Sequence, residues 1–67
     1  MKKLVKIYDE GNDYHLVDVN EIVYIKSLNG NRGLEIYFSN GEKIRLFFMF
    51  EEKVMEILEK LGIEIAE

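Results

Sequence analysis

Residues Leu34 to Phe48 read LEIYFSNGEKIRLFF, with apolar and polar side chains alternating on both sides of the turn dipeptide Asn40-Gly41. This pattern is typical of a β-hairpin with one buried face. If Gly41 takes the left-handed position of a three-residue loop, Phe38 pairs with Glu42 and the register is set. The predicted pairs are Ile36 with Ile44 and Leu34 with Leu46 on the inner face, and Tyr37 with Lys43 and Glu35 with Arg45 on the outer face.

Three further strands are predicted before this hairpin, at residues 3–8, 14–19 and 22–27. A polar loop at residues 9–13, a tight corner at residues 20–21 and a glycine-rich connector at residues 29–33 separate them. Pairing the third strand with the hairpin places Val23 opposite Phe38 and Ile25 opposite Ile36. The outer face then carries two rows across the strands, Tyr24-Tyr37-Lys43 and the charge-matched row Lys26-Glu35-Arg45.

After Phe50 the period becomes that of an amphipathic helix, with glutamates in the first turn and Gly62 as a natural C-cap. Residues 63–67 alternate again, and either add a short edge strand or fray. The sequence therefore predicts an α+β domain: a five-stranded antiparallel meander, open or curled toward a small barrel, with one C-terminal helix packed on its apolar face. The predicted core comprises Val5, Ile7, Val17, Val19, Val23, Ile25, Leu34, Ile36, Phe38, Ile44, Leu46, Phe48, Val54, Ile57, Leu58 and Leu61.

The 67 residues are expected to form one small domain, residues 1–67, with 48% hydrophobic and 33% charged residues. A chain of this size buries only about 60% of its unfolded surface, so disulfides, metal or oligomerisation commonly support it. Because there is no cysteine and a single histidine, we expect no metal or cofactor, which leaves self-association. No apolar run is long enough to cross a membrane, and Lys6 and Asp9 interrupt any signal peptide, so a cytoplasmic location is expected.

The net charge of −4 is concentrated at the C-terminal end. Residues 1–50 carry seven acids and seven bases, whereas residues 51–67 carry six glutamates and two lysines. Binding to a phosphate backbone depends on Lys and Arg, so an acidic chain is poorly suited to it. Net charge therefore disfavours a nucleic-acid partner, although a local basic patch would permit one.

Residue types that carry catalysis are scarce. His15 has Asp13 and Asp18 near it in the sequence, and Ser27 and Ser39 are the only aliphatic hydroxyl side chains. Neither serine lies in a nucleophile motif, and a half-exposed strand residue is the simpler interpretation of His15. The acidic loop around residue 11 lacks the ligand spacing of an EF-hand, and the connector at residues 29–33 lacks the ending of a P-loop. We therefore expect no enzymatic activity.

Four consecutive large apolar residues, Phe47 to Phe50, cannot all face one side of a sheet. Phe48 can point inward and Phe50 can pack under the helix, which leaves Phe47 or Met49 exposed; alternatively, the chain curls and buries all four. An exposed aromatic cluster is a candidate interface, and tyrosines beside cations also resemble a base-stacking sheet with a basic rim. The candidate interaction surface comprises Tyr24, Lys26, Arg32, Tyr37, Lys43, Arg45, Phe47 and Met49.

Residues 14–27 and 34–44, with the helix that follows, resemble the front half of a LytTR-type DNA-binding domain. That family has an Asp/Glu-Ile-x-Tyr-Ile-Glu-Ser segment before a hairpin and a helix. The matching segment here runs from Glu21 to Ser27, with Lys26 in place of the usual Glu. The family's later Phe-x-x-x-His-Arg-Ser strand and its DNA-contacting loops have no counterpart in these residues, so the resemblance carries over no DNA-contact residue.

The same pattern is similar to small flagellar proteins of the SwrD/FlbD type. They share an Ile-x-x-Ile strand, a turn like Ser39-Asn40-Gly41 and a final helix rich in Val, Ile and Glu, and their short length favours this second resemblance. The predicted function is a small non-enzymatic protein-interaction or regulatory module that is homo-oligomeric. The alternative is a minimal nucleic-acid-binding, LytTR-like module of transcription regulation.

Overall fold

The structure, a computed structural model, describes residues 3–9, 11–30 and 32–66. These residues contain five strands, one α-helix and a short 3-10 turn, which confirms the predicted α+β class. The strands are β1 (Val5–Tyr8), β2 (Tyr14–Val17), β3 (Ile22–Leu28), β4 (Gly33–Phe38) and β5 (Lys43–Phe47); the turn η1 (Val19–Glu21) precedes β3, and the helix α1 (Glu51–Lys60) follows β5.

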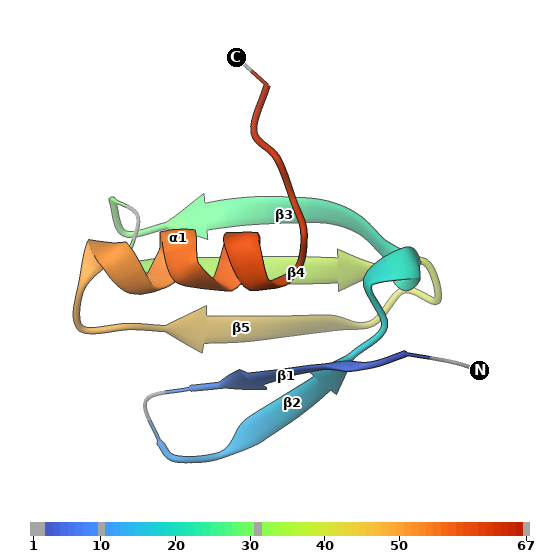
Figure 1. Cartoon of the computed structure of the whole chain (residues 1–67), viewed down its shortest axis with the longest axis horizontal. Coiled ribbons are helices and arrows are strands. Elements are labelled where there is room, and N and C mark those ends of the chain that lie inside the picture. The colour runs from blue at the N-terminus through green and yellow to red at the C-terminus, as the bar shows by residue number, and fades with distance from the viewer. Residues whose placement is uncertain (1–2, 10, 31, 67) are drawn as a thin grey trace.

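The described strands form two antiparallel sheets, β1-β2 and β3-β4-β5, and do not close into a barrel. Figure 1 shows α1 lying across one side of the three-stranded sheet, with the β1-β2 hairpin beside β5. The sheets separate at η1, where the Asn20 N–H donates to the Asp18 carboxylate at 3.0 Å and the chain turns into β3. The meander therefore has the predicted strand order, with a break between β2 and β3.

The β4-β5 hairpin has the predicted register. Gly41 has a φ of 90°, in the left-handed region that favours glycine. Its N–H donates to the Phe38 carbonyl at 3.0 Å, and the Phe38 N–H donates to the Glu42 carbonyl at 2.9 Å. The resulting pairs are Leu34 with Leu46, Glu35 with Arg45, Ile36 with Ile44 and Tyr37 with Lys43.

The pairing predicted for β3 is correct at one end and wrong at the other. Ile25 pairs with Ile36 as expected, but Phe38 pairs with Ile22 and not with Val23. A β-bulge lies between Ile22 and Tyr24, and the Val23 side chain is 66% exposed. Val23 is therefore not a core residue, because the bulge inserts one position into the two-residue alternation on which the prediction depended.

The core lies between α1 and the inner side of the β3-β4-β5 sheet, and Ile7 and Val17 attach the β1-β2 hairpin to it. Apart from Val23, the predicted core residues are buried or packed against the core. The buried ones are Ile7, Val17, Leu34, Ile36, Leu46, Phe48, Val54, Ile57, Leu58 and Leu61, and the half-buried ones are Val5, Val19, Ile25, Phe38 and Ile44.

The end of α1 follows the prediction. Gly62 has a φ of 74°, and its N–H donates to the Glu59 carbonyl at 2.9 Å. The Ile63 N–H donates to the Leu58 carbonyl at 3.0 Å, and the Ile63 side chain packs against the core. Residues 63–66 form no strand, and residue 67 lies outside the described residues, so the described part of this segment does not add an edge strand.

Candidate interaction surface

The side of the β3-β4-β5 sheet that faces away from α1 is called the outer face here. Its residues follow from strand alternation and from the register, because side chains opposite each other on neighbouring strands share a face. Three rows cross the strands: Tyr24-Tyr37-Lys43, Lys26-Glu35-Arg45 and Leu28-Gly33-Phe47. The first two rows are those predicted from the sequence.

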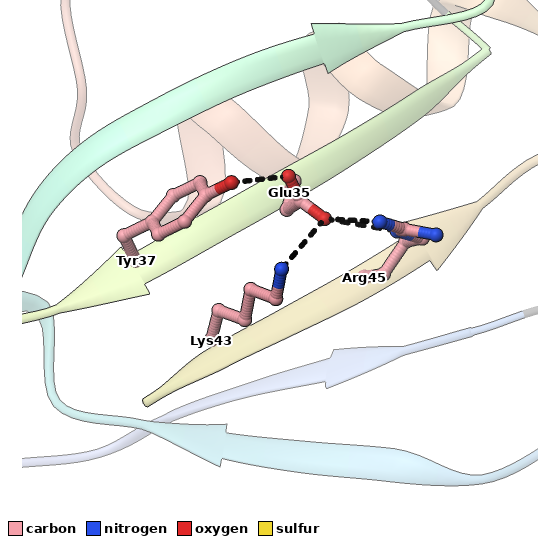
Figure 2. A network of polar contacts seen from close by, with 4 residues as sticks. All are labelled: Glu35, Tyr37, Lys43 and Arg45. Atoms are coloured by element: carbon pink, nitrogen blue, oxygen red, sulfur yellow. Dashed lines mark hydrogen bonds and ion pairs between the residues drawn. The ribbon is translucent and has the colours of Figure 1, made fainter. Parts of the chain in front are cut away.

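Glu35 lies at the centre of the outer face, yet it is only 3% exposed. Figure 2 shows its carboxylate enclosed by side chains from its own strand and from β5. Oε2 accepts hydrogen bonds from Arg45 Nη2 at 2.6 Å and Nε at 2.9 Å, and Lys43 Nζ lies 3.8 Å away. The Tyr37 hydroxyl donates to Oε1. Each carboxylate oxygen therefore has a protein donor, as a buried charge requires.

These contacts hold the carboxylate in its ionised form. The hydrogen bonds from Tyr37 and Arg45 lower the pKa of Glu35 to about 2, against the opposing effect of burial. The same hydrogen bond raises the pKa of Tyr37, because losing the phenolic proton would place two negative charges side by side. At neutral pH the cluster is a carboxylate, a neutral tyrosine, an arginine and a lysine.

Tyrosine rings form one side of the outer face. The Tyr24 and Tyr37 ring centroids lie 5.2 Å apart with an interplanar angle of 57°, within the geometry of favourable aromatic pairs. Lys43 Nζ lies 5.7 Å from the Tyr37 centroid, close enough for a cation–π contact. Tyr24 is on β3, an edge strand of the sheet, and is 56% exposed. The ring pair therefore offers solvent an aromatic surface beside a cation.

Phe47 forms the opposite side of the outer face, over Gly33. A Cβ on Gly33 would lie 3.2 Å from Phe47 Cδ1 and 2.9 Å from the Leu46 carbonyl oxygen, so the phenyl ring occupies the space that a side chain would need. Phe47 is still 47% exposed. A glycine paired with an aromatic residue across two strands is a recognised way to cover a gap on a sheet.

The outer face thus presents cations and aromatic rings while hiding its acid. Lys26 is exposed, and the Lys43 and Arg45 side chains are each 55% exposed. The acid in these rows is Glu35, and it lies beneath Lys43, Arg45 and Tyr37. A positively charged surface with exposed rings results on a chain whose net charge is −4.

Two of the eight predicted surface residues lie outside this face. Arg32 is exposed in the β3-β4 connection; its N–H donates to the Leu28 carbonyl at 3.1 Å, and its carbonyl accepts from the Phe48 N–H at 2.8 Å. Met49 is exposed in the bend between β5 and α1. Phe48 points inward as expected, but Phe50 is exposed and does not pack under the helix, so a curled chain that buries all four residues is also excluded.

Burial of Glu35 was not foreseen, because alternation on an outer face implies exposure. A signal was present in the sequence: Glu35 is the one acid among three cations in the two predicted rows, with a tyrosine two positions along its own strand. Neighbours of that kind can both cover and satisfy a carboxylate.

The other candidates for chemistry are His15 and the two loops considered for ligands. His15 Nε2 lies 3.2 Å from Asp9 Oδ2, a carboxylate other than the two considered from the sequence. Asp9 also accepts from the Gly11 N–H at 2.9 Å, so the pair braces the β1-β2 turn. Glu10 and Asn31, in the two loops considered for ligands, lie outside the described residues. The described part of the chain holds no cluster of three or more metal-ligating side chains.

Three comparisons of the chain with known proteins gave no match: no family model, curated protein or solved structure matches it. No helix formed by the described residues combines the length and the apolar character needed to cross a bilayer.

Proposed function

We propose that this protein is a small, non-enzymatic protein-interaction module that self-associates through the outer face. The observation that carries the proposal is the burial of Glu35 beneath Lys43, Arg45 and Tyr37. It leaves a sheet face of exposed cations and rings that α1 does not cover (Figures 1 and 2).

The composition of this face supports a protein partner. Tyr, Phe and Arg are enriched at interfaces, and large rings in a central patch commonly carry much of the binding energy. Tyr24 and Phe47 flank the charged row and are about half exposed. Self-association would also add buried surface to a 67-residue chain, which can bury little by itself. A regulatory role in the cytoplasm accords with the resemblances noted in the sequence.

Sedimentation velocity over a concentration series tests the proposal. We expect the average mass of the wild-type chain to rise with concentration, and the variants Tyr24→Ala and Phe47→Ala to weaken that rise. Tyr14→Ala is the matched control, because Tyr14 belongs to another exposed tyrosine pair, with Tyr8 at 5.8 Å, on the other sheet. A wild-type chain that stays monomeric throughout, or an equal effect of Tyr14→Ala, would overturn the proposal.

Nucleic-acid binding is the second candidate, favoured by the Tyr24-Tyr37 ring pair beside Lys43. Single-stranded bases stack on such rings, and nearby cations attract the phosphates. The net charge of −4 weakens that attraction, which is why this candidate ranks second. It requires a single-stranded oligonucleotide to bind at low salt, with affinity that falls as salt rises and that Tyr24→Ala reduces; no binding at low salt excludes it.

A further inference from the structure

The solvent side of α1 carries an acidic stripe. Glu52, Glu56 and Glu59 are exposed and fall at i, i+4 and i+7, on one side of the helix. The buried residues of α1 lie on the opposite side of the helix and face the sheet. Met55, exposed beside this stripe, adds an apolar contact point. Across Glu51–Lys60, four glutamates against two lysines leave a net charge of −2, and one of the lysines, Lys53, reaches Glu56 at 3.4 Å.

The acidic stripe and the outer face lie on opposite sides of the molecule. Figure 1 looks down the shortest axis and shows α1 in front of the three-stranded sheet, whereas Figure 2 shows the Glu35 cluster in front and the helix behind. The molecule measures 33 × 32 × 21 Å, so these are its two broad faces. One broad face is therefore basic and the other acidic.

This charge arrangement decides how two copies fit. If two outer faces met, Lys26, Lys43 and Arg45 of one copy would oppose the same cations of the other. If two helices met, their glutamate stripes would oppose each other. Like charges set opposite each other are unfavourable at an interface, whereas the outer face of one copy against the acidic stripe of another brings opposite charges together.

From the charge complementarity of these two faces, we infer that copies of this chain stack head to tail, with the outer face of each copy receiving α1 of the next. The inference rests on the proposed self-association and names the surface that the outer face binds. Met55 would then meet one exposed ring of the outer face, Tyr24 or Phe47, beside the charged groups. Because two different patches meet, a dimer still has one free outer face and one free acidic stripe. Further copies can therefore add, and the assembly extends beyond two copies unless the rotation between neighbouring copies closes a ring.

Charge reversal on each face tests this arrangement. The sheet variant is Lys26→Glu with Lys43→Glu, and the helix variant is Glu52→Lys with Glu59→Lys. We expect each variant alone to associate about tenfold or more weakly than wild type, because like charges then meet at the contact. An equimolar mixture of the two should recover association, since the acidic outer face of one then meets the basic helix of the other.

Two controls keep the result interpretable. Lys6→Glu makes the same charge change on β1, outside both faces, and should associate like wild type. Circular dichroism must show that each variant is folded; if the double sheet variant is not, Lys26→Glu alone should give a smaller loss of association.

The outcomes separate this inference from the proposed function. A helix variant that associates like wild type, or a wild-type mass that stops rising at the dimer, overturns head-to-tail stacking and leaves self-association through the outer face standing. A wild-type chain that stays monomeric overturns both the proposed self-association and head-to-tail stacking. If a single-stranded oligonucleotide binds that monomer, nucleic-acid binding becomes the function of the outer face. Recovery of association only in the mixture supports both.

Discussion

Glu35 shows how neighbouring side chains can remove an outward-pointing residue from water. Its strand position directs it away from α1, yet Arg45 and Lys43 from β5 and Tyr37 from β4 cover it. The cost of burying the charge is offset because every contact favours the ionised form. The positive charge of the outer face therefore depends on how these three side chains cover the Glu35 carboxylate.

Acid should reveal this cluster. The pKa of Glu35 is about 2 in the folded chain and 4.5 ordinarily, so the ionised carboxylate stabilises the fold above a pH of about 4.5, and this contribution is lost as the pH falls toward about 2. Tyr37→Phe removes the hydroxyl donor and keeps the ring, so the pKa of Glu35 should rise toward 4.5; the acid-dependent loss should then be smaller and should be complete at a higher pH. Carboxyl-carbon NMR titration measures the pKa, and urea unfolding at several pH values measures the stability.

Glu35→Gln and Glu64→Gln provide the comparison for the unfolding measurements. Both remove one carboxylate, but Glu64 is exposed and lies outside the cluster. The acid-dependent loss of stability should shrink in Glu35→Gln and persist in Glu64→Gln. Identical pH profiles for wild type and Glu35→Gln would show that the cluster does not hold the carboxylate in the manner described.

At the scale of elements, the β4-β5 hairpin was predictable because its turn determines its pairing. Gly41 occupies the left-handed position, and every later pair follows from counting outward by one residue on each strand. No turn of known length fixes the pairing of β3 in the same way. The corner before β3 does not determine which of its residues pairs with which residue of β4, and alternating apolar residues do not reveal the bulge at Val23. Alternation also identifies a buried face without naming the partner strand, so the break between β2 and β3 was not foreseen.

The cross-strand rows of the candidate site were predictable from the sequence, but the burial of its side chains was not. Cross-strand pairing placed Tyr24, Tyr37 and Lys43 in one row and Glu35 with Arg45 in the next, as the structure has them. Exposure depends on how far long side chains fold over their neighbours, which the backbone pattern does not encode. For the same reason the exposure of Phe50 escaped prediction, since the angle at which the chain enters α1 decides it.

Two truncations test the packing of the strands. Leu46→Ala in β5 removes a fully buried side chain and should lower the free energy of unfolding by about 2–5 kcal/mol. Val23→Ala in β3 should change it by less than about 0.5 kcal/mol, because the bulge holds that side chain in solvent. Urea unfolding followed by circular dichroism measures both. A large loss from Val23→Ala would mean that β3 pairs without the bulge.

At the scale of the whole molecule, the chain separates its charges across the sheet. The net charge of −4 describes the sum and conceals a basic outer face and an acidic helix. Surface charges act over about the screening length, which is about 10 Å at 0.1 M salt, so an approaching molecule senses the face it meets more than the total.

Salt should therefore control self-association. Raising the ionic strength from about 0.1 M to about 1 M shortens the screening length from about 10 Å to about 3 Å and should dissociate copies held by opposite charges. Light scattering at fixed protein concentration measures the change in mass. Association that strengthens with salt would assign the contact to Tyr24, Phe47 and other apolar groups in place of the charged rows.

The division of the strands into two sheets determines how the molecule comes apart. Backbone ladders tie β3, β4 and β5 to one another, while the β1-β2 hairpin is attached through side chains such as Ile7 and Val17. A cleft of about 300 Å³ lined by Tyr8 and Lys60 lies along that junction. Units held by few apolar contacts open at lower free energy than laddered ones. We therefore expect the N-terminal hairpin to detach first and to leave the helix packed on three strands.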